Sequence, residues 1–235
     1  MISRKDLYRG ICLPTMPSNE LAEFVGILAG DGYMNYYPYQ NKYLIEIAGD
    51  KRLDSEYLGF HVSSLILNLF CLKPSVYIRN DQNSMYLRLI SKGLYYYLTA
   101  IGFKSGKKEQ IGVPEWILTK KEYMISFMRG VADTDFSLHY RDEYPIISVS
   151  LKSLLLIQQI LFFLRDNGFK IGKYYREDKN DTRGYNSTTI YKLRLNGRAN
   201  FGLWQHLIGF RNQRHLRKIK INSADHLPFS QTTDL

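Results

Sequence analysis

The sequence predicts an α+β protein made of two pseudo-symmetric αββαββα repeats joined by a linker. Apolar periodicity and turn residues give the same order of helices and strands in residues 18–105 and again in residues 122–210. The segments 87–103 and 193–210 also share the pattern Leu-Arg-Leu followed by Ile-Gly-Phe, at a shift of 106 residues from position 87 to position 193. The intervening polar stretch, residues 106–121, contains glycine and proline and is typical of a linker.

The elements of the first repeat follow from caps, spacing and turns. Leu21, Phe24 and Leu28 recur at helical spacing after Ser18, a residue type that caps helices, and the helix is expected to end near Gly32. The elements expected after it are a hairpin of residues 33–39 and 42–48, a helix that begins after Asp50 and ends at residue 70, a hairpin of residues 75–79 and 84–90, and a helix over residues 91–101.

The second repeat is expected to have the same elements. They are an amphipathic helix over residues 122–135, a hairpin over residues 137–149 that turns at Tyr144 and Pro145, a helix over residues 153–167, strands over residues 170–176 and 188–195, and a helix over residues 198–207. Residues 1–17 form an N-terminal extension and residues 211–235 a basic C-terminal extension, which is expected to be frayed after Ser223.

Composition excludes several classes of protein. The chain has 235 residues with 45% hydrophobic and 23% charged residues, which is typical of a globular protein. Its most apolar helical run, residues 153–164, is too short to span a membrane, and no secretory signal follows Met1. The cysteines and histidines do not have the spacing of zinc ligands. We therefore expect an intracellular protein, cytoplasmic in a prokaryote or organellar, without membrane contact.

The charge balance points to a polyanionic partner. Lys and Arg total 32 against 22 Asp and Glu, which gives a net charge of +10 and a pI near 9.4, and the chain has 19 tyrosines. The alternative is that these cations only solubilise the surface.

Two matching segments open the two repeats. Residues 24–32 read FVGILAGDG and residues 128–136 read MRGVADTDF, at a shift of 104 residues. Because small residues four positions apart share one helix face, the two helices are predicted to approach closely. The small residues are Gly26 and Gly30 in the first segment and Gly130 and Thr134 in the second.

Asp31 and Asp135 stand at the ends of these helices. An anion at the negative end of a helix dipole that faces a second anion is costly for structure alone, and a divalent cation relieves both conflicts. Hard oxygen ligands favour Mg²⁺ over zinc. The alternative places both residues on exposed last turns of ordinary amphipathic helices. Asp133, whose counterpart is Ala29, is predicted to be a solvated or capping residue.

The paired segments resemble the motif of the LAGLIDADG homing endonucleases, in the single-chain, two-motif form of the archaeal-type members. The resemblance covers nearly the whole chain. It implies a saddle of two antiparallel sheets with the motif helices paired at its centre, and metal-dependent hydrolysis of double-stranded DNA at a long asymmetric site. It also implies Mg²⁺ as cofactor, with Mn²⁺ or Ca²⁺ able to substitute for binding, and the ligands Asp31, Gly30, Asp135 and Thr134. Phe136 replaces the terminal glycine of the motif and is expected to reshape the exit from the helix or to narrow the second metal half-site.

The resemblance further implies three catalytic lysines and a DNA-binding surface. Lys51 and Lys152 follow the second strand of each repeat, where the family commonly holds a polar or basic group beside the scissile phosphates, and Lys92 follows the fourth strand. Strand alternation places cations and tyrosines on one face of each sheet, and in the family this face lies along the DNA major groove. The candidate DNA-binding residues are Tyr36, Arg79, Tyr86, Arg88, His139, Arg141, Tyr175, Arg176, Lys192, Arg194, Arg211 and Arg214.

The sequence therefore predicts a monomeric, site-specific DNA endonuclease, either intron-encoded or free-standing. The alternative is an RNA maturase or a catalytically silent DNA-binding protein with the same fold. Self-splicing is not expected, because the chain lacks a nucleophile at its start and a His-Asn pair at its end.

Overall fold

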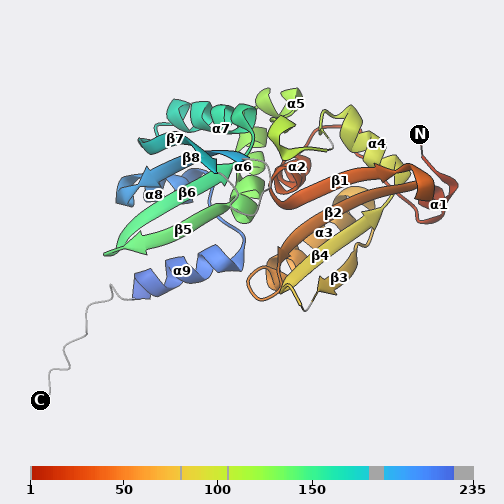
Figure 1. Cartoon of the computed structure of the whole chain (residues 1–235), viewed down its shortest axis with the longest axis horizontal. Coiled ribbons are helices and arrows are strands. Elements are labelled where there is room, and N and C mark those ends of the chain that lie inside the picture. Colours follow the sequence, from red (N-terminus) through yellow and green to blue (C-terminus); the bar gives the residue numbers. More distant parts are fainter. Residues whose placement is uncertain (1, 80, 105, 180–187, 225–235) are drawn as a thin grey trace, which may run out of the picture.

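The computed structural model describes residues 2–79, 81–104, 106–179 and 188–224, and shows two four-stranded antiparallel sheets with helices on one face of each (Figure 1). The strand order is β1-β2-β4-β3 in the first sheet and β5-β6-β8-β7 in the second. The same order in both sheets confirms the predicted α+β fold of two repeats. No helix among the described residues is both long enough and apolar enough to cross a membrane.

The two repeats contain equivalent elements. The first consists of α2 (Asn19–Asp31), β1 (Gly32–Tyr37), β2 (Lys42–Asp50), α3 (Ser63–Phe70), β3 (Ser75–Arg79), β4 (Ser84–Ile90) and α4 (Lys92–Ala100). The second consists of α6 (Lys121–Asp135), β5 (Phe136–Arg141), β6 (Tyr144–Leu151), α7 (Leu154–Asp166), β7 (Ile171–Lys179), β8 (Thr188–Asn196) and α8 (Gly197–Leu207).

Several short elements lie outside this common plan. They are α1 (Arg4–Tyr8), η1 (Pro38–Gln40), the π-helical stretch η2 (Tyr57–Val62), η3 (Lys108–Gln110) and α5 (Glu115–Leu118), together with the longer C-terminal helix α9 (Gln213–Ala224). The predicted linker thus contains η3 and α5, and the predicted C-terminal extension begins with a helix. Residues 225–235, for which we expect a frayed chain, lie outside the described residues.

The helices α2 and α6 pack against each other at the centre, as the small residues predict. A β carbon at Gly26 would collide with the carbonyl oxygen of Phe127, and one at Gly130 would collide with the carbonyl oxygen of Glu23. Backbone therefore touches backbone across this interface. A β carbon at Gly130 would also meet the backbone of Gly26, and one at Gly30 would meet Thr134, four residues further along both helices. The helices therefore run parallel and their C-terminal ends meet.

One face of each sheet carries the core. Ile45, Ile47 and Leu87 in the first sheet and Val149 and Leu193 in the second are at most 3% exposed and pack beneath the helices. The residues that alternate with them lie on the opposite, uncovered face. Each sheet can thus present a polar face to a partner while the helices stay in place.

The hairpin between β5 and β6 turns two residues earlier than predicted. Arg141 pairs with Tyr144, so the loop consists of Asp142 and Glu143, with φ angles of 47° and 61°. Two positive φ values are typical of the tight turns that match strand twist. The expected turn at Tyr144 and Pro145 is therefore wrong, and both residues belong to β6.

The helix expected after Asp50 begins several residues later. The carboxylate of Asp50 accepts hydrogen bonds from the backbone N–H groups of Arg52 and Leu53, at 2.7 and 2.9 Å, and so caps a turn. The helical segment starts at residue 55 and passes through η2 into α3.

Phe136 does not alter the exit from α6. Its backbone angles, φ −81° and ψ 155°, are nearly those of Gly32 at the end of α2, φ −78° and ψ 154°. The side chain turns into the core of the second repeat, where its ring lies 5.3 Å from that of Trp204. The expectation that Phe136 reshapes this exit is wrong, because the same conformation suits both residues.

Candidate active site

The structure brings Asp31 and Asp135 together at the ends of the paired helices. Asp31 is the last residue of α2 and Asp135 the last residue of α6. A β carbon at Gly30 would lie 2.9 Å from Oδ2 of Asp135 and 2.8 Å from Cβ of Thr134. Both side chains of the second motif therefore pack directly against Gly30, the residue before Asp31. This contact requires a glycine at position 30.

Burial sets the electrostatics of this pair. Burial, and after it the negative charge of Asp135, together raise the pKa of Asp31 to about 7. Burial also raises the pKa of Asp135 to about 6. The positive charges of Lys108 and Arg214 lower both pKa values without cancelling the effect of burial. The positive charges present at the site therefore do not fully compensate for the burial of the two carboxylates.

Lys108 and Arg214 reach the backbone beside the two aspartates. The ammonium group of Lys108 donates a hydrogen bond to the carbonyl oxygen of Gly30, and the guanidinium of Arg214 donates one to the carbonyl oxygen of Thr134. Both carbonyl groups belong to residues that the sequence resemblance implies as metal ligands. Lys108 and Arg214 thus each occupy a carbonyl oxygen that the resemblance implies as a metal ligand.

The two cations occupy equivalent places in the repeats. Lys108 stands five residues after Phe103, and Arg214 four residues after Phe210, in each case after the Ile-Gly-Phe segment. Sequence reasoning missed Lys108 because it assigned residues 106–121 to a linker. The repeated Ile-Gly-Phe segment was the signal that would have found it.

Asp133 holds the chain that enters α9. Its carboxylate accepts hydrogen bonds from the backbone N–H groups of Arg211 and Asn212, both at 2.9 Å, and its side chain is fully buried. Burial raises the pKa of Asp133 to about 7, against the two hydrogen bonds, which lower it. The residue caps this segment as expected, but it is not solvated.

The basic C-terminal run has partners inside the protein. Its contacts join α9 and the residues before it to acidic groups of the first repeat and to β5. They are Arg211 with Glu23 at 3.3 Å, Arg214 with Asp54 at 3.3 Å, Arg217 with Glu56 at 3.1 Å, and Lys218 with the carbonyl oxygen of Leu138 at 2.9 Å. These cations tie the two repeats together. That Arg211 and Arg214 bind DNA stays a prediction.

Of the three predicted catalytic lysines, Lys51 and Lys152 lie on the side of the sheets where the aspartates emerge. β1 begins at Gly32, directly after Asp31, and Gly32 pairs with Ile47 of β2, near the end of that strand. Lys51 follows β2, and Lys152 follows β6 in the same way. Their catalytic role stays a prediction.

Lys92 lies at the other end of its sheet. Because β4 is antiparallel to β2, its last residue, Ile90, pairs with Leu44 near the start of β2. The ammonium group of Lys92 lies 5.6 Å from the ring centre of Tyr43 and 5.9 Å from that of Tyr96. The strand register thus removes Lys92 from the aspartates, and its predicted catalytic role is wrong.

Most candidate DNA-binding residues of the strands share the uncovered faces of the sheets. Arg88 pairs with Glu46, and Tyr86 with Tyr77, on the face opposite the buried leucines. In the second sheet Arg194 pairs with Ser148. The candidates on these faces are Arg79, Tyr86 and Arg88 in the first sheet and His139, Arg141, Tyr175, Lys192 and Arg194 in the second.

Tyr36 and Arg176 lie on the opposite face from these residues. Tyr36 pairs with Tyr43 on the side of buried Met34, and the two tyrosine rings stack at 4.4 Å. Arg176 pairs with Tyr191 and makes an ion pair with Asp178 at 3.1 Å. The prediction that they share one sheet face with the other candidates is wrong. Side chains alternate between the two faces along a strand, and Tyr36 and Arg176 stand at positions that point to the helix-covered face.

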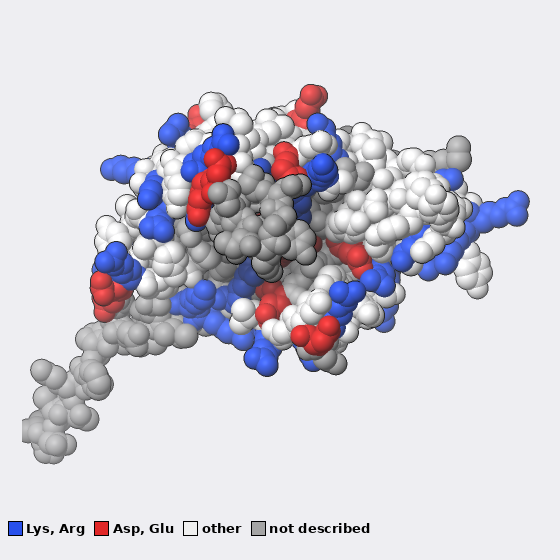
Figure 2. All heavy atoms as spheres, in the orientation of Figure 1, with Lys and Arg blue, Asp and Glu red and all other residues white. Residues whose placement is uncertain are grey.

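Acidic groups and aromatic rings fix several cations of the uncovered faces. Arg88 forms an ion pair with Glu46 at 2.6 Å and lies 4.9 Å from the ring centre of Tyr77, and Lys192 pairs with Glu177. Lys and Arg are interspersed with Asp and Glu across the face of the molecule shown in Figure 2. The surface therefore combines positive charge with positioned hydrogen-bonding groups.

The fold is shared with proteins of known structure. No protein-family model and no curated protein sequence matches the chain. The structure of I-DmoI in complex with DNA and Ca aligns with a TM-score of 0.58 at 18% identity, over 86% of this chain and 97% of that chain. The LAGLIDADG homing endonuclease I-LtrWI bound to target DNA aligns with a TM-score of 0.51 at 9% identity, over 88% and 90%.

Full-length DUF199/WhiA from Thermatoga maritima aligns with a TM-score of 0.57 at 12% identity, over 93% of this chain and 65% of that chain. Similarity at such identities establishes the architecture of the chain. It confirms the resemblance at the level of the fold. The chain therefore has the two-repeat fold of the LAGLIDADG homing endonucleases.

Proposed function

We propose that the protein is a site-specific double-strand DNA endonuclease that hydrolyses phosphodiester bonds with a divalent metal ion, most favourably Mg²⁺. The observation that carries this proposal is the meeting of Asp31 and Asp135 at the ends of two helices in backbone contact. This arrangement concentrates negative charge where a helix dipole is also negative, and a bound metal ion would relieve this repulsion beyond what Lys108 and Arg214 do. That I-DmoI and I-LtrWI structures with the same fold contain DNA supports the choice of partner.

The oxygen donors at this position fit Mg²⁺. Asp31 with the carbonyl group of Gly30, and Asp135 with the carbonyl group of Thr134, offer hard ligands to one or two ions. The described residues contain no group of three or more acidic, His or Cys side chains that could hold an ion alone. Water and DNA phosphate oxygens would complete the coordination, so metal and DNA should bind cooperatively.

A bound ion would activate water and stabilise the charge that develops on the phosphate group. The chain's own groups then have distinct tasks. Asp31 and Asp135 would hold the ion, and Lys51 and Lys152 would approach phosphate groups next to the cleaved bonds. If the ion takes the carbonyl oxygen of Gly30 as a ligand, Lys108 would have to give up its hydrogen bond to this oxygen.

The two uncovered sheet faces favour a long and asymmetric DNA site in the major groove. The first sheet offers Arg79, Tyr86 and Arg88, whereas the second offers a different set that includes His139 and Lys192. Because Arg and Lys can bond guanine edges, the two halves would read different sequences. Both motif helices belong to one chain, so a monomer suffices, and the proposed activity requires an intracellular location.

Selection of cleaved molecules from a randomised DNA library tests the proposal. The wild type should enrich one long asymmetric sequence in the presence of Mg²⁺, whereas Asp31→Asn should enrich none. If the wild type enriches no sequence, it is not a site-specific nuclease.

The second candidate is a catalytically silent DNA-binding protein or an RNA maturase of the same fold. The bonds from Lys108 and Arg214 to the carbonyl groups of Gly30 and Thr134 favour it, because protein cations there can replace a metal ion permanently. Sequence-specific binding of DNA or RNA without metal-dependent cleavage would support this candidate.

A further inference from the structure

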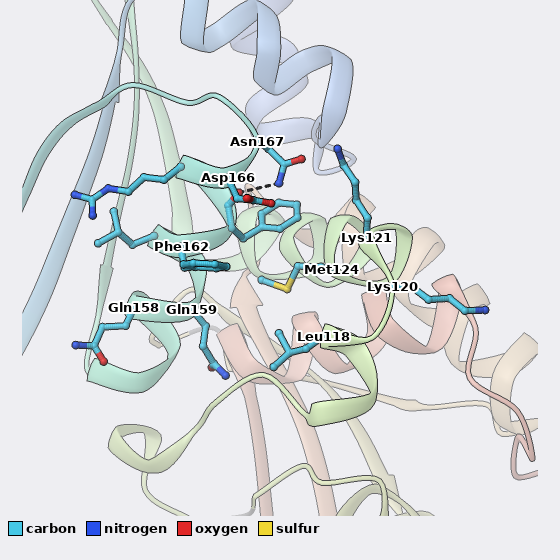
Figure 3. A pocket seen from close by; sticks show the side chains of 12 residues that line it. Leu118, Lys120, Lys121, Met124, Gln158, Gln159, Phe162, Asp166 and Asn167 are labelled. Atoms are coloured by element: carbon cyan, nitrogen blue, oxygen red, sulfur yellow. Dashed lines mark hydrogen bonds between the residues drawn. The ribbon is translucent and has the colours of Figure 1, made fainter.

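The outer face of α7 forms one side of an open apolar groove. Phe162 and Leu155 on this face are 74% and 49% exposed, although most apolar residues of α7 are buried. Phe162 lines a hollow of about 790 Å³ between α7, α5 and the start of α6 (Figure 3). Leu155 lines a second hollow of about 660 Å³ that extends towards the end of α4.

The two hollows adjoin each other. Leu118 and Gln159 line both of them. Along α7 the lining runs from Leu155 to Asn167, which corresponds to roughly 18 Å, or three helical turns. Met124 lies against the first hollow, and Leu118, on the side facing α7, is 51% exposed. An apolar groove of this length matches the face of a helix of three to four turns.

Charges around the groove are mainly positive. The charged lining residues are Lys104, Lys120, Lys121 and Arg165 against Glu115 and Asp166. A ligand that covers the apolar lining would therefore gain from acidic groups beside its apolar residues.

The groove lies on the helix-covered side of the second sheet. Buried residues of α7, such as Ile157 and Ile160, face the core, and Phe162 points away from it. The candidate DNA-binding residues Lys192 and Arg194 lie on the uncovered face of the same sheet. A ligand in the groove would thus leave that face free.

We propose that this groove binds an amphipathic helix of a partner protein, with apolar residues on the face that enters the groove and acidic residues beside them. Phe162 and Leu118 contact the apolar face, and Lys121 and Arg165 pair with the acidic residues. The proposal does not depend on nuclease activity.

Two synthetic peptides of about 16 residues test the proposal. Both carry Leu and Phe at the spacing i, i+3, i+4, i+7, and the remaining positions are Glu-rich in one peptide and Lys-rich in the other. Fluorescence anisotropy with the full chain should show binding of the acidic peptide and at least tenfold weaker binding of the basic one. Phe162→Glu should weaken binding of the acidic peptide at least tenfold, and Lys121→Glu several-fold.

Phe60→Glu is the matched control, because Phe60 is 73% exposed and does not line either hollow. It should leave the affinity for the acidic peptide unchanged, and circular dichroism should show that all variants are folded. The proposal is overturned if the acidic peptide does not bind, if the basic peptide binds equally well, or if Phe162→Glu has no effect. Light scattering that shows a dimer lost in Phe162→Glu would assign the groove to a second copy of the chain instead.

Discussion

The ammonium group of Lys108 donates a hydrogen bond to the carbonyl oxygen of Gly30, the residue before Asp31. Arg214 makes the equivalent contact with Thr134, the residue before Asp135. Each repeat thus supplies one carboxylate and, after its Ile-Gly-Phe segment, one cation. A metal ion that uses the same carbonyl groups has to compete with these cations.

Lys108→Met should strengthen Ca²⁺ binding to the protein without DNA. The change removes a positive charge and frees the carbonyl oxygen of Gly30. At about pH 8 both aspartates are largely ionised, since their pKa values are about 7 and 6, so the lost cation costs little carboxylate charge. Titration calorimetry should show several-fold tighter binding than in the wild type and in Lys107→Met. Equal or weaker affinity in Lys108→Met would show that Lys108 does not compete with the metal.

Gly26→Ala and Gly130→Ala should each lower the free energy of unfolding by about 1–3 kcal/mol or more, which is the usual cost of overpacking. A β carbon at either position meets a backbone carbonyl group of the other helix, which cannot move without separating α2 and α6. Gly202→Ala in α8 is the control, because no atom lies within 4 Å of its added carbon, and it should be neutral or slightly stabilising. Denaturant unfolding measures all three changes. Equal effects at Gly26 and Gly202 would contradict the close contact.

Replacement of the two aspartates of the second motif should have opposite effects on stability. Asp133→Leu leaves the N–H groups of Arg211 and Asn212 without an acceptor and should lower the free energy of unfolding by about 2–4 kcal/mol. Asp135→Asn relieves repulsion by Asp31 and should leave the stability unchanged or raise it. Guanidinium unfolding without metal measures both. A large loss of stability in Asp135→Asn would mean that its carboxylate supports the fold.

Because of His215, the protein should become less stable as the pH is lowered through the acid range. The imidazole is buried and stacks on Phe210 at 4.3 Å; burial, together with the charges of Arg214 and Lys218, lowers its pKa from 6.5 to about 3. Below pH 6.5 the unfolded chain binds a proton that the native chain does not, so stability decreases until the pH reaches about 3. The slope for one group is about 1.4 kcal/mol per pH unit.

His215→Phe keeps an aromatic ring on Phe210 but removes this proton. Between about pH 6 and 4 its unfolding free energy should therefore change less with pH than that of the wild type. Other titrating groups contribute equally to both proteins, so the difference between the two curves isolates His215. Parallel curves would show that His215 can be protonated in the folded state.

The sequence predicted the parts of the fold that depend on local periodicity. α2, α6 and the succession of strands along the chain follow from apolar spacing, and the close packing of the motif helices from Gly26 and Gly130. The turn at Asp142 and Glu143 was missed because neither residue is a glycine or a proline, which are the usual signals of a positive φ or a tight turn.

What the sequence did not show at the site depends on contacts between distant segments. The run that contains Arg211 and Arg214 appeared free in the sequence, because Glu23 and Asp54 are more than 150 residues away. Lys92 was predicted to lie near the aspartates because it follows a strand. Since β4 is antiparallel to β2, the end of β4 and Lys92 lie at the far end of the sheet. Tertiary pairing, which no local pattern encodes, decided both cases.

The central claim is that Asp31 and Asp135 together hold the metal ion that cuts DNA. The decisive measurement combines plasmid cleavage in Mg²⁺ with gel-shift binding in Ca²⁺, on a target that contains the selected site. Asp31→Asn and Asp135→Asn should each reduce the cutting of both strands by orders of magnitude. DNA binding without metal should be kept or become tighter, because a negative charge near phosphate is lost. Asp133→Asn should retain cleavage at a temperature where it is folded. Binding by the wild type without metal-dependent nicking, or unchanged cleavage by either asparagine variant of Asp31 and Asp135, would contradict the account.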